Sequence, residues 1–405
     1  MVLTKRLRTS RMTPCPKWNN NCFSRHKSEP SLRRKKHSTL TRNGYDTVAV
    51  TTRHGRFAHK RVRLLDQSGR FVEVSAQVIS QPLRRSCLHW SSKLPFSQVQ
   101  RLLQEQTGER LLSEDTLWRI CQSQALALDE QQEKIIEQSR HLPGVCYQAA
   151  TDIYDPEAAE SVIFTDAIGV KAQKPTRQKV GEAKVAKTEK RHDTDVMILP
   201  RPDGGEHFVC EGVSNKWSMV EAADAYLKQN WSRDSNGGNT LAPLVALTDG
   251  AKTIRADLLV LFGENVRVIL DWYHLKTRVY QNLSMVAHGK KEREGWQNQL
   301  LPLLWHGKVE DALKFLAGLK ARNASALSDL VGYLTKHSDE IIDYERRQQA
   351  GKPIGSGRME KGVDQVIGRR QKGKGMSWTK VGSRALALLT CAELNARPTP
   401  VRAGA

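Results

Sequence analysis

The chain has 405 residues, with 64 lysines and arginines against 43 aspartates and glutamates, and a formal net charge of +21. This length allows two or three domains with a sizeable core. The sequence lacks both the run of about 18 to 20 apolar residues that spans a membrane and the apolar segment of a secretory signal. We therefore expect neither a transmembrane protein nor a secreted one. The positive charge favours a polyanionic partner, nucleic acid first and a ribosome or acidic membrane second.

Cysteine usage favours a reducing, cytoplasmic location. The seven cysteines are an odd number and are scattered through a long chain, which argues against a disulfide framework. None of them has the paired spacing of a structural zinc site. The sequence also contains no phosphate-binding P-loop motif.

Most of the positive charge lies near the N-terminus. Residues 1–63 contain 17 lysines and arginines, but only Glu29 and Asp46 as acids. Within this part, residues 1–44 are rich in Ser, Pro and Asn and have little apolar periodicity, which predicts a flexible basic arm. Its densest basic run is predicted to contact DNA phosphates, with a solvated tail as the alternative. This run consists of Arg33, Arg34, Lys35 and Lys36.

Residues 45–142 predict a small sheet followed by a pair of helices. Two short helical faces lie between residues 95 and 124 and are joined through Gly108, with Ser113 as the N-cap of the second. The pair predicts a helix-turn-helix-like DNA-binding region, with simple helix packing as an equal alternative. Before it, apolar and polar residues alternate in three runs separated by glycine-containing turns, which indicates an antiparallel meander. The runs are 48–50, 57–64 and 71–74.

The pattern changes after Pro143 and Gly144 to that of an α/β domain. Three strands, a helix, a strand, a helix and a strand predict a mixed sheet whose last two strands are parallel. This part spans 143–274, and the mostly helical stretch 275–350 follows it. The predicted elements are 161–165, 196–199, 208–213, 219–228, 244–249, 252–262 and 266–271.

Three aspartates end or follow apolar runs of this predicted sheet. They are Asp166, Asp249 and Asp271. Because α/β proteins place their chemistry at the carboxyl ends of parallel strands, we read the three together. Carboxylates gathered at a sheet edge suit Mg²⁺, and a pair of such ions can activate a water or a 3′-hydroxyl in phosphodiester displacement. Taken singly, each aspartate could instead cap a turn.

A fourth acid, Glu360, lies in a strongly basic segment. The turn at 353–357 is expected to open a helix near Arg358, which places Glu360 in the first helical turn and Val363 and Ile367 on the buried side. A carboxylate in such a segment is typical of a surface ion pair or of a metal ligand beside bound phosphates. The basic residues at the far end of the helix are Arg369, Arg370, Lys372 and Lys374.

Three runs together resemble a known family. They are LTDGAKTIR at 247–255, ILDWYHLK at 269–276, and GKPIGSGRMEKG at 351–362 with RRQKGKGMSW after it. They resemble the bacterial insertion-sequence DDE transposases of the ISKra group, relatives of the Mutator-like transposases. The resemblance covers roughly residues 161–395 and is most specific in the C-terminal half. It implies an RNase H-like fold with an all-helical insertion between the second aspartate and the glutamate.

The resemblance also implies the site. Asp166, Asp249 and Glu360 would bind two Mg²⁺ or Mn²⁺ ions, with Asp271 and His274 in supporting positions. The match at Asp166 is the loosest, so Asp152 is an alternative first acid, and Asp271 is an alternative to Asp249. The spacing is 22 residues from Asp249 to Asp271 and 111 from Asp249 to Glu360.

These observations predict a bacterial, nucleoid-associated transposase that cuts the ends of its element and joins them to target DNA. Its partners would be duplex DNA with terminal inverted repeats, target DNA and further copies of the chain. The alternatives are a repurposed, non-catalytic DNA-binding protein and a nuclease with an RNase H fold. The last predicted parts are the Glu360 helix with its basic segment, 351–396, and a tail, 397–405.

Overall fold

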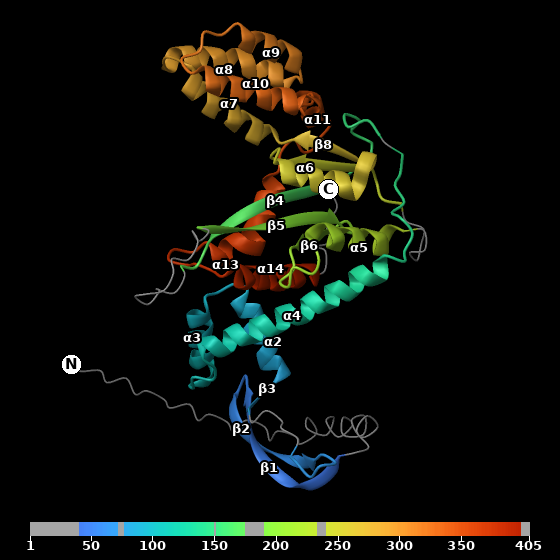
Figure 1. Ribbon diagram of the computed structural model, residues 1–405, viewed down its shortest axis with the longest axis vertical. Coiled ribbons are helices and arrows are strands. Elements are labelled where there is room, and N and C mark those ends of the chain that lie inside the picture. The colour runs from blue at the N-terminus through green and yellow to red at the C-terminus, as the bar shows by residue number, and fades with distance from the viewer. Residues whose placement is uncertain (1–39, 72–76, 150, 175–189, 233–239, 398–405) are drawn as a thin grey trace, which may run out of the picture. The chain divides into compact units, whose positions relative to one another are not determined.

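The computed structural model describes residues 40–71, 77–149, 151–174, 190–232 and 240–397. The chain forms two compact units, one ending at Ser80 and the other starting at Gln81 (Figure 1). The predicted DNA-binding run at 33–36 and the tail from 398 onward lie outside the described residues. Among the helices of the described ranges, none combines the length and the apolar character needed to cross a bilayer.

The first unit contains a three-stranded sheet of order β2-β1-β3. As expected, β1 (Thr41–Thr52) and β2 (Gly55–Leu65) form an antiparallel hairpin. Of the expected third run, 71–74, only Phe71 is described, and it forms an antiparallel bridge with Leu65 at the end of β2. A further short strand that the pattern did not predict, β3 (Gln77–Ile79), pairs with the other edge of β1 and runs parallel to it.

The second unit is built on a five-stranded mixed sheet of order β6-β5-β4-β7-β8. β4, β7 and β8 are parallel, and β5 and β6 are antiparallel to their neighbours. The predicted mixed sheet with two parallel final strands is confirmed. The strands are β4 (Ser161–Lys171), β5 (Arg191–Pro200), β6 (Glu206–Cys210), β7 (Leu244–Thr248) and β8 (Val266–Leu270).

Helices cover both faces of this sheet. Alternate strand residues such as Ile163 and Met197 pack with helices α5 (Met219–Trp231) and α6 (Lys252–Phe262), which lie in front of the sheet in Figure 1. The intervening residues, such as Phe164, face the opposite layer. This is the period-two alternation of a sheet that is buried on both sides.

Three helices precede the sheet, namely α2 (Gln81–Ser91), α3 (Phe96–Thr107) and α4 (Glu114–Ser139). Ser113 caps α4 by accepting a hydrogen bond from the Thr116 amide, and Gly108 ends α3 in the left-handed region, both as predicted. The helices belong to the second compact unit, and β1–β3 belong to the first. Within the second unit, the buried Asp129 carboxylate of α4 accepts the Val213 amide at 2.8 Å and so joins α4 to the segment that follows β6.

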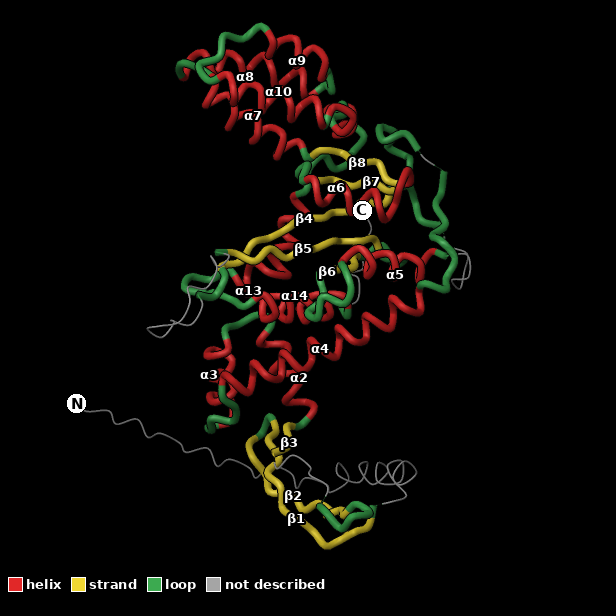
Figure 2. The backbone as a smooth tube through the Cα atoms, viewed as in Figure 1, coloured by secondary structure: helices red, strands yellow, loops and turns green. Residues whose placement is uncertain are grey.

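The predicted helical stretch forms directly after β8 (Figure 2). It begins three residues earlier than the expected 275, because Asp271 caps the first helix through the amides of Tyr273 and His274. The helices are α7 (Trp272–Val286), α8 (Lys290–Trp305), α9 (Val309–Ala317), α10 (Ala324–Lys336) and α11 (Tyr344–Gln349).

The chain then returns to the sheet through α12 (Gly357–Val363), a π-helical turn at Asp364–Gly368, and α13 (Arg369–Gln371). Val363 and Ile367 are buried, as the sequence pattern predicted. The last helix, α14 (Lys380–Asn395), packs against α4 and β6. The helix that carries Glu360 therefore lies in the layer that faces Phe164.

Candidate functional site

The strand register brings three aspartates to the same level of the sheet. Phe164 of β4 pairs with Leu247 of β7, and Leu247 pairs with Ile269 of β8. Asp166, Asp249 and Asp271 each lie two residues beyond these partners, with Asp166 within β4 and with Asp249 and Asp271 directly after the adjacent parallel strands β7 and β8. This is the carboxyl edge at which α/β proteins gather functional groups.

The half-buried Asp166 experiences the field of the other acids. Burial raises the pKa of Asp166, and the nearby carboxylates of Asp249 and Glu360 raise it further. A hydrogen bond from the Ala167 amide, at 2.8 Å, and the neighbouring His274 act in the opposite direction. The structure thus brings Asp166, Asp249, Glu360 and His274 within electrostatic reach of one another, although they come from β4, the β7–α6 turn, α12 and α7.

Asp249 is held by a tight turn. Its carboxylate accepts the Ala251 amide at 2.8 Å, and Gly250 between them has a φ of +82°, which favours glycine. A Cβ atom on Gly250 would lie 3.2 Å from Nε2 of His337. His337 is buried and contacts Glu340 at 2.6 Å through its other ring nitrogen. A residue of the helical insertion therefore packs against the turn that holds Asp249.

Asp271 is almost fully buried and all its hydrogen bonds are to donors of the chain. Oδ1 accepts the amides of Tyr273 at 2.6 Å and His274 at 3.0 Å. Oδ2 accepts the amide of Ser356 and, at 2.5 Å, its hydroxyl. With its lone pairs used in this way, Asp271 is a positioning residue that ties the start of α7 to the turn before Glu360, and it does not compete with Asp249 for a metal ion.

Two predicted site residues lie at helix N-termini and are exposed. Glu360 is in the first turn of α12, and His274 is in the first turn of α7. Asp271 holds the starts of both helices together, because it accepts the amides of His274 in α7 and of Ser356 just before α12. The exposure leaves both side chains accessible to a substrate that approaches this edge of the sheet.

Sequence reasoning missed two residues of the helical insertion, Tyr333, which interacts with Asp249, and Arg278, which lies beside Tyr333. Burial raises the pKa of Tyr333 on α10 to about 12, and the Asp249 carboxylate contributes to this shift. The Arg278 guanidinium of α7 lies 5.6 Å from the Tyr333 ring centre. No motif marked either residue, because the approach of Tyr333 to Asp249 depends on the tertiary placement of α10.

The acids do not form a preassembled metal centre. Among the residues that the structure describes, no group of three or more His, Cys, Asp and Glu side chains is close enough to hold a metal ion. The donor chemistry nevertheless suits a hard divalent cation, because Asp166, Asp249 and Glu360 are all carboxylates. Asp152, the alternative first acid, caps a local turn by accepting the Tyr154 amide.

The predicted basic contacts separate into exposed and buried side chains. Lys372 and Lys374 are exposed, and Arg369 is exposed and paired with Asp364 at 2.8 Å. Arg370 differs from the expectation. Its side chain is buried, donates to the Ser91 carbonyl at 2.7 Å, and lies 5.0 Å from the rings of Phe96 and Trp378. Arg370 therefore joins α13 to α2 and is not available to a phosphate.

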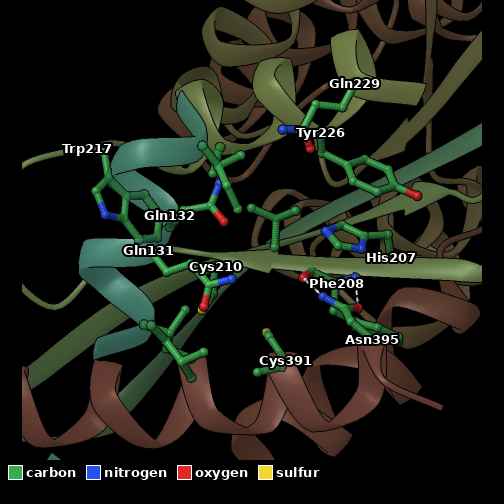
Figure 3. A pocket seen from close by; sticks show the side chains of 16 residues that line it. Gln131, Gln132, His207, Phe208, Cys210, Trp217, Tyr226, Gln229, Cys391 and Asn395 are labelled. Atoms are coloured by element: carbon green, nitrogen blue, oxygen red, sulfur yellow. Dashed lines mark hydrogen bonds between the residues drawn. The ribbon is translucent and has the colours of Figure 1, made fainter. Parts of the chain in front are cut away.

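A separate small cavity lies between α4, α5, β6 and α14 (Figure 3). The His207 ring stacks on Tyr226 with centres 3.7 Å apart, and burial lowers the pKa of His207 to about 4. The thiols of Cys210 and Cys391 interact, and this contact, with burial, raises the pKa of Cys391. The lining includes no acid among the described residues. A buried, stacked histidine and two cysteines in contact indicate packing.

Comparison with known proteins yields little. No protein-family model matches the chain, and no curated protein matches its sequence. Among solved structures, the Drosophila P element transposase strand transfer complex is similar at a TM-score of 0.25 and 11% identity, over 80% of each chain. No conclusion about fold or function follows from a likeness this low.

Proposed function

We propose that the chain is a DDE-type DNA transposase with an RNase H-like catalytic domain and a helical insertion. One observation carries the proposal: Asp166, Asp249 and Glu360, from three separate segments, share one electrostatic neighbourhood at the carboxyl edge of a mixed sheet. The insertion between Asp271 and Glu360, expected from the family resemblance, supports the same proposal.

In this proposal Asp166, Asp249 and Glu360 hold two Mg²⁺ or Mn²⁺ ions. The ions, when bound, supply charge stabilisation and an activated oxygen nucleophile for phosphodiester displacement. The chain's own residues prepare the site. Asp249 is oriented by the Ala251 amide, and Asp271 holds the turn that presents Glu360. His274 offsets part of the acidic repulsion at Asp166.

The proposed substrate is duplex DNA with terminal inverted repeats, followed by target DNA. Lys372 and Lys374 are exposed in the segment that follows the Glu360 helix, and Arg369 joins them. These three side chains are proposed to contact backbone phosphates near the reacting bond. The basic run at 33–36 is proposed to add contacts outside the described part of the chain. Cutting and joining two ends would require at least two copies of the chain.

A second candidate is a DNA-binding protein without catalytic activity, which would need only basic contacts such as the exposed Lys372 and Lys374. A nuclease with the same fold would share the acids and differ only in substrate. The two alternatives predict different products, so one assay separates all three.

The test is cleavage and strand transfer of a labelled duplex carrying the inverted repeat that flanks the gene. The reaction contains Mg²⁺ or Mn²⁺, with EDTA as the control. We expect metal-dependent nicking at the repeat end and a joined product, both lost in Glu360→Gln with DNA affinity retained. The matched control is Glu310→Gln, another exposed glutamate in a first helical turn. Binding without cleavage would favour the non-catalytic protein, and cleavage without joining would favour the nuclease.

A further inference from the structure

A second groove of the same unit begins beside the acidic edge. Its volume is about 730 Å³, and it lies over β4 and the end of β5, under the loop that joins α11 to α12. Its lining includes Tyr273 and Gly355 as well as Lys352 and Glu160. This volume is in the range of pockets that hold small organic ligands, about 300 to 1,000 Å³, and is far too small for a double helix.

At Glu160, which lines the groove, two cations lie beside one carboxylate. Glu160 is engaged by the fully buried Arg347, whose two terminal nitrogens lie 2.5 and 3.1 Å from the carboxylate oxygens. Lys352 approaches the same carboxylate to 3.3 Å. Two cations therefore share one anion. A buried charge without full compensation is unfavourable.

The Lys352 ammonium is only partly compensated, because the Glu160 carboxylate with which it forms an ion pair is also bound by Arg347. The Lys352 side chain is only 8% exposed, and within the described residues its Nζ has no hydrogen-bond partner. An ammonium carries three donors, and Lys352 lines the groove. An anionic ligand in the groove would satisfy it.

The lining of the groove also includes an aromatic ring, that of Tyr273. Tyr273 is 58% exposed, and it lies against Gly355, where a Cβ atom would come within 2.5 Å of the ring. The ring covers Gly355, whereas Gly357 has open space at its Cβ position, so a ligand can approach the backbone closely there. An exposed ring beside a bare backbone suits stacking of a planar base.

We propose that this groove holds an unpaired nucleotide of the DNA strand that leads to the reacting phosphate, with Lys352 bound to a phosphate and Tyr273 stacked on a base. Of the three cations that line the groove, Arg201 is paired with Asp203 and Arg358 with Glu206, whereas Lys352 shares Glu160 with Arg347. The inference rests on the proposed function only for the statement that DNA is the substrate. It assigns Lys352 and Tyr273 to binding and not to the chemical step.

The test measures binding of thymidine trinucleotide, with and without a 5′-phosphate, to the full chain by calorimetry in EDTA. A charge-assisted contact predicts about tenfold tighter binding of the phosphorylated form. Lys352→Gln should remove this preference and Lys352→Arg should keep it. Tyr273→Leu should weaken both forms by about tenfold, because stacking is lost. Lys320→Gln, at an exposed lysine outside the groove, is the matched control.

The assignment of Lys352 to phosphate binding is contradicted if the wild type binds both trinucleotides equally. It is also contradicted if a Lys352→Gln variant with wild-type melting still prefers the phosphorylated trinucleotide. Should Lys352→Gln fail to fold, Tyr273→Leu still decides, since its side chain is exposed and unchanged binding would contradict the proposal. Both measurements omit metal. Failure of strand transfer with intact trinucleotide binding would refute the transposase and leave the groove, whereas the reverse result would refute the groove alone.

Discussion

The middle of β4 and the end of β8 each present an aspartate at the same level of the sheet, in opposite circumstances. Asp271 after β8 accepts four hydrogen bonds and is buried. Asp166 on β4 accepts one from the Ala167 amide and is close to two further carboxylates. A satisfied buried acid stabilises a fold, whereas an acid among acids lowers stability and is typical of a functional site.

The largest expected effect is on activity at Asp166. Asp166→Asn should reduce strand transfer by about 100-fold or more, because a charge at the reacting centre is lost, without lowering the melting temperature. Strand-transfer rates and thermal melts measure the two effects. The control is Asp155→Asn, at an exposed aspartate that caps a local turn by accepting the Glu157 amide. Retention of most of the activity would remove Asp166 from the site and return Asp152 to consideration.

The opposite result is expected for Asp271. Asp271→Ala leaves buried donors of α7 and Ser356 without an acceptor, so the free energy of unfolding should fall by about 3 kcal/mol. Asp271→Asn keeps one acceptor oxygen and should lose less. Urea denaturation measures both variants. A stable Asp271→Ala protein that is merely inactive would mean that Asp271 acts in the chemistry and not in positioning.

The turn that holds Asp249 gives a third, smaller effect. Gly250→Ala would place a Cβ atom 2.9 Å from Leu270 at a φ of +82°, and should cost about 2 to 3 kcal/mol of stability. Gly108→Ala also has a positive φ, in the left-handed region, but open space around the Cβ atom, so it should cost only about 1 kcal/mol. Equal losses in urea denaturation would show that the packing of His337 and Leu270 under the turn contributes nothing.

The smallest effect is the pH dependence of stability at Asp166. The folded-state pKa of Asp166 lies above its ordinary value of 3.8, so the folded protein holds this proton more tightly than the unfolded chain does. Wild-type stability is therefore lost as pH rises from 3.8 through the folded pKa. Asp166→Asn lacks this loss. Its stability relative to wild type should increase across that window in urea titrations, and a flat difference would contradict the raised pKa.

Local patterns predicted much of the fold. The order of strands and helices around the central sheet followed from periodicity, and the N-cap at Ser113 from its short-range chemistry. The existence of β3 and of α2 was missed. The first is a strand of only three residues that pairs with β1, and the second is a short helix with only three buried residues.

The candidate site was predictable only in part, for the same physical reason. Strand ends pointed to Asp166 and Asp249, but the bonds between Asp271 and Ser356 span 85 residues, and no short-range pattern reports such a contact. Arg370 read as a DNA ligand because its neighbours are basic, whereas its partners Ser91 and Phe96 lie far away in the chain. Groups satisfied by distant partners are hidden from a linear reading.

The burial of Arg370 also affects how binding would respond to ionic strength. Arg347 and Arg384 are buried as well, so the formal charge of +21 overstates the cations that can displace counterions from DNA. Each phosphate contact steepens the fall of log K with log salt concentration by about 0.9. Lys374→Gln should flatten that slope by about one contact, whereas Arg370→Gln should leave the slope alone and lower the melting temperature.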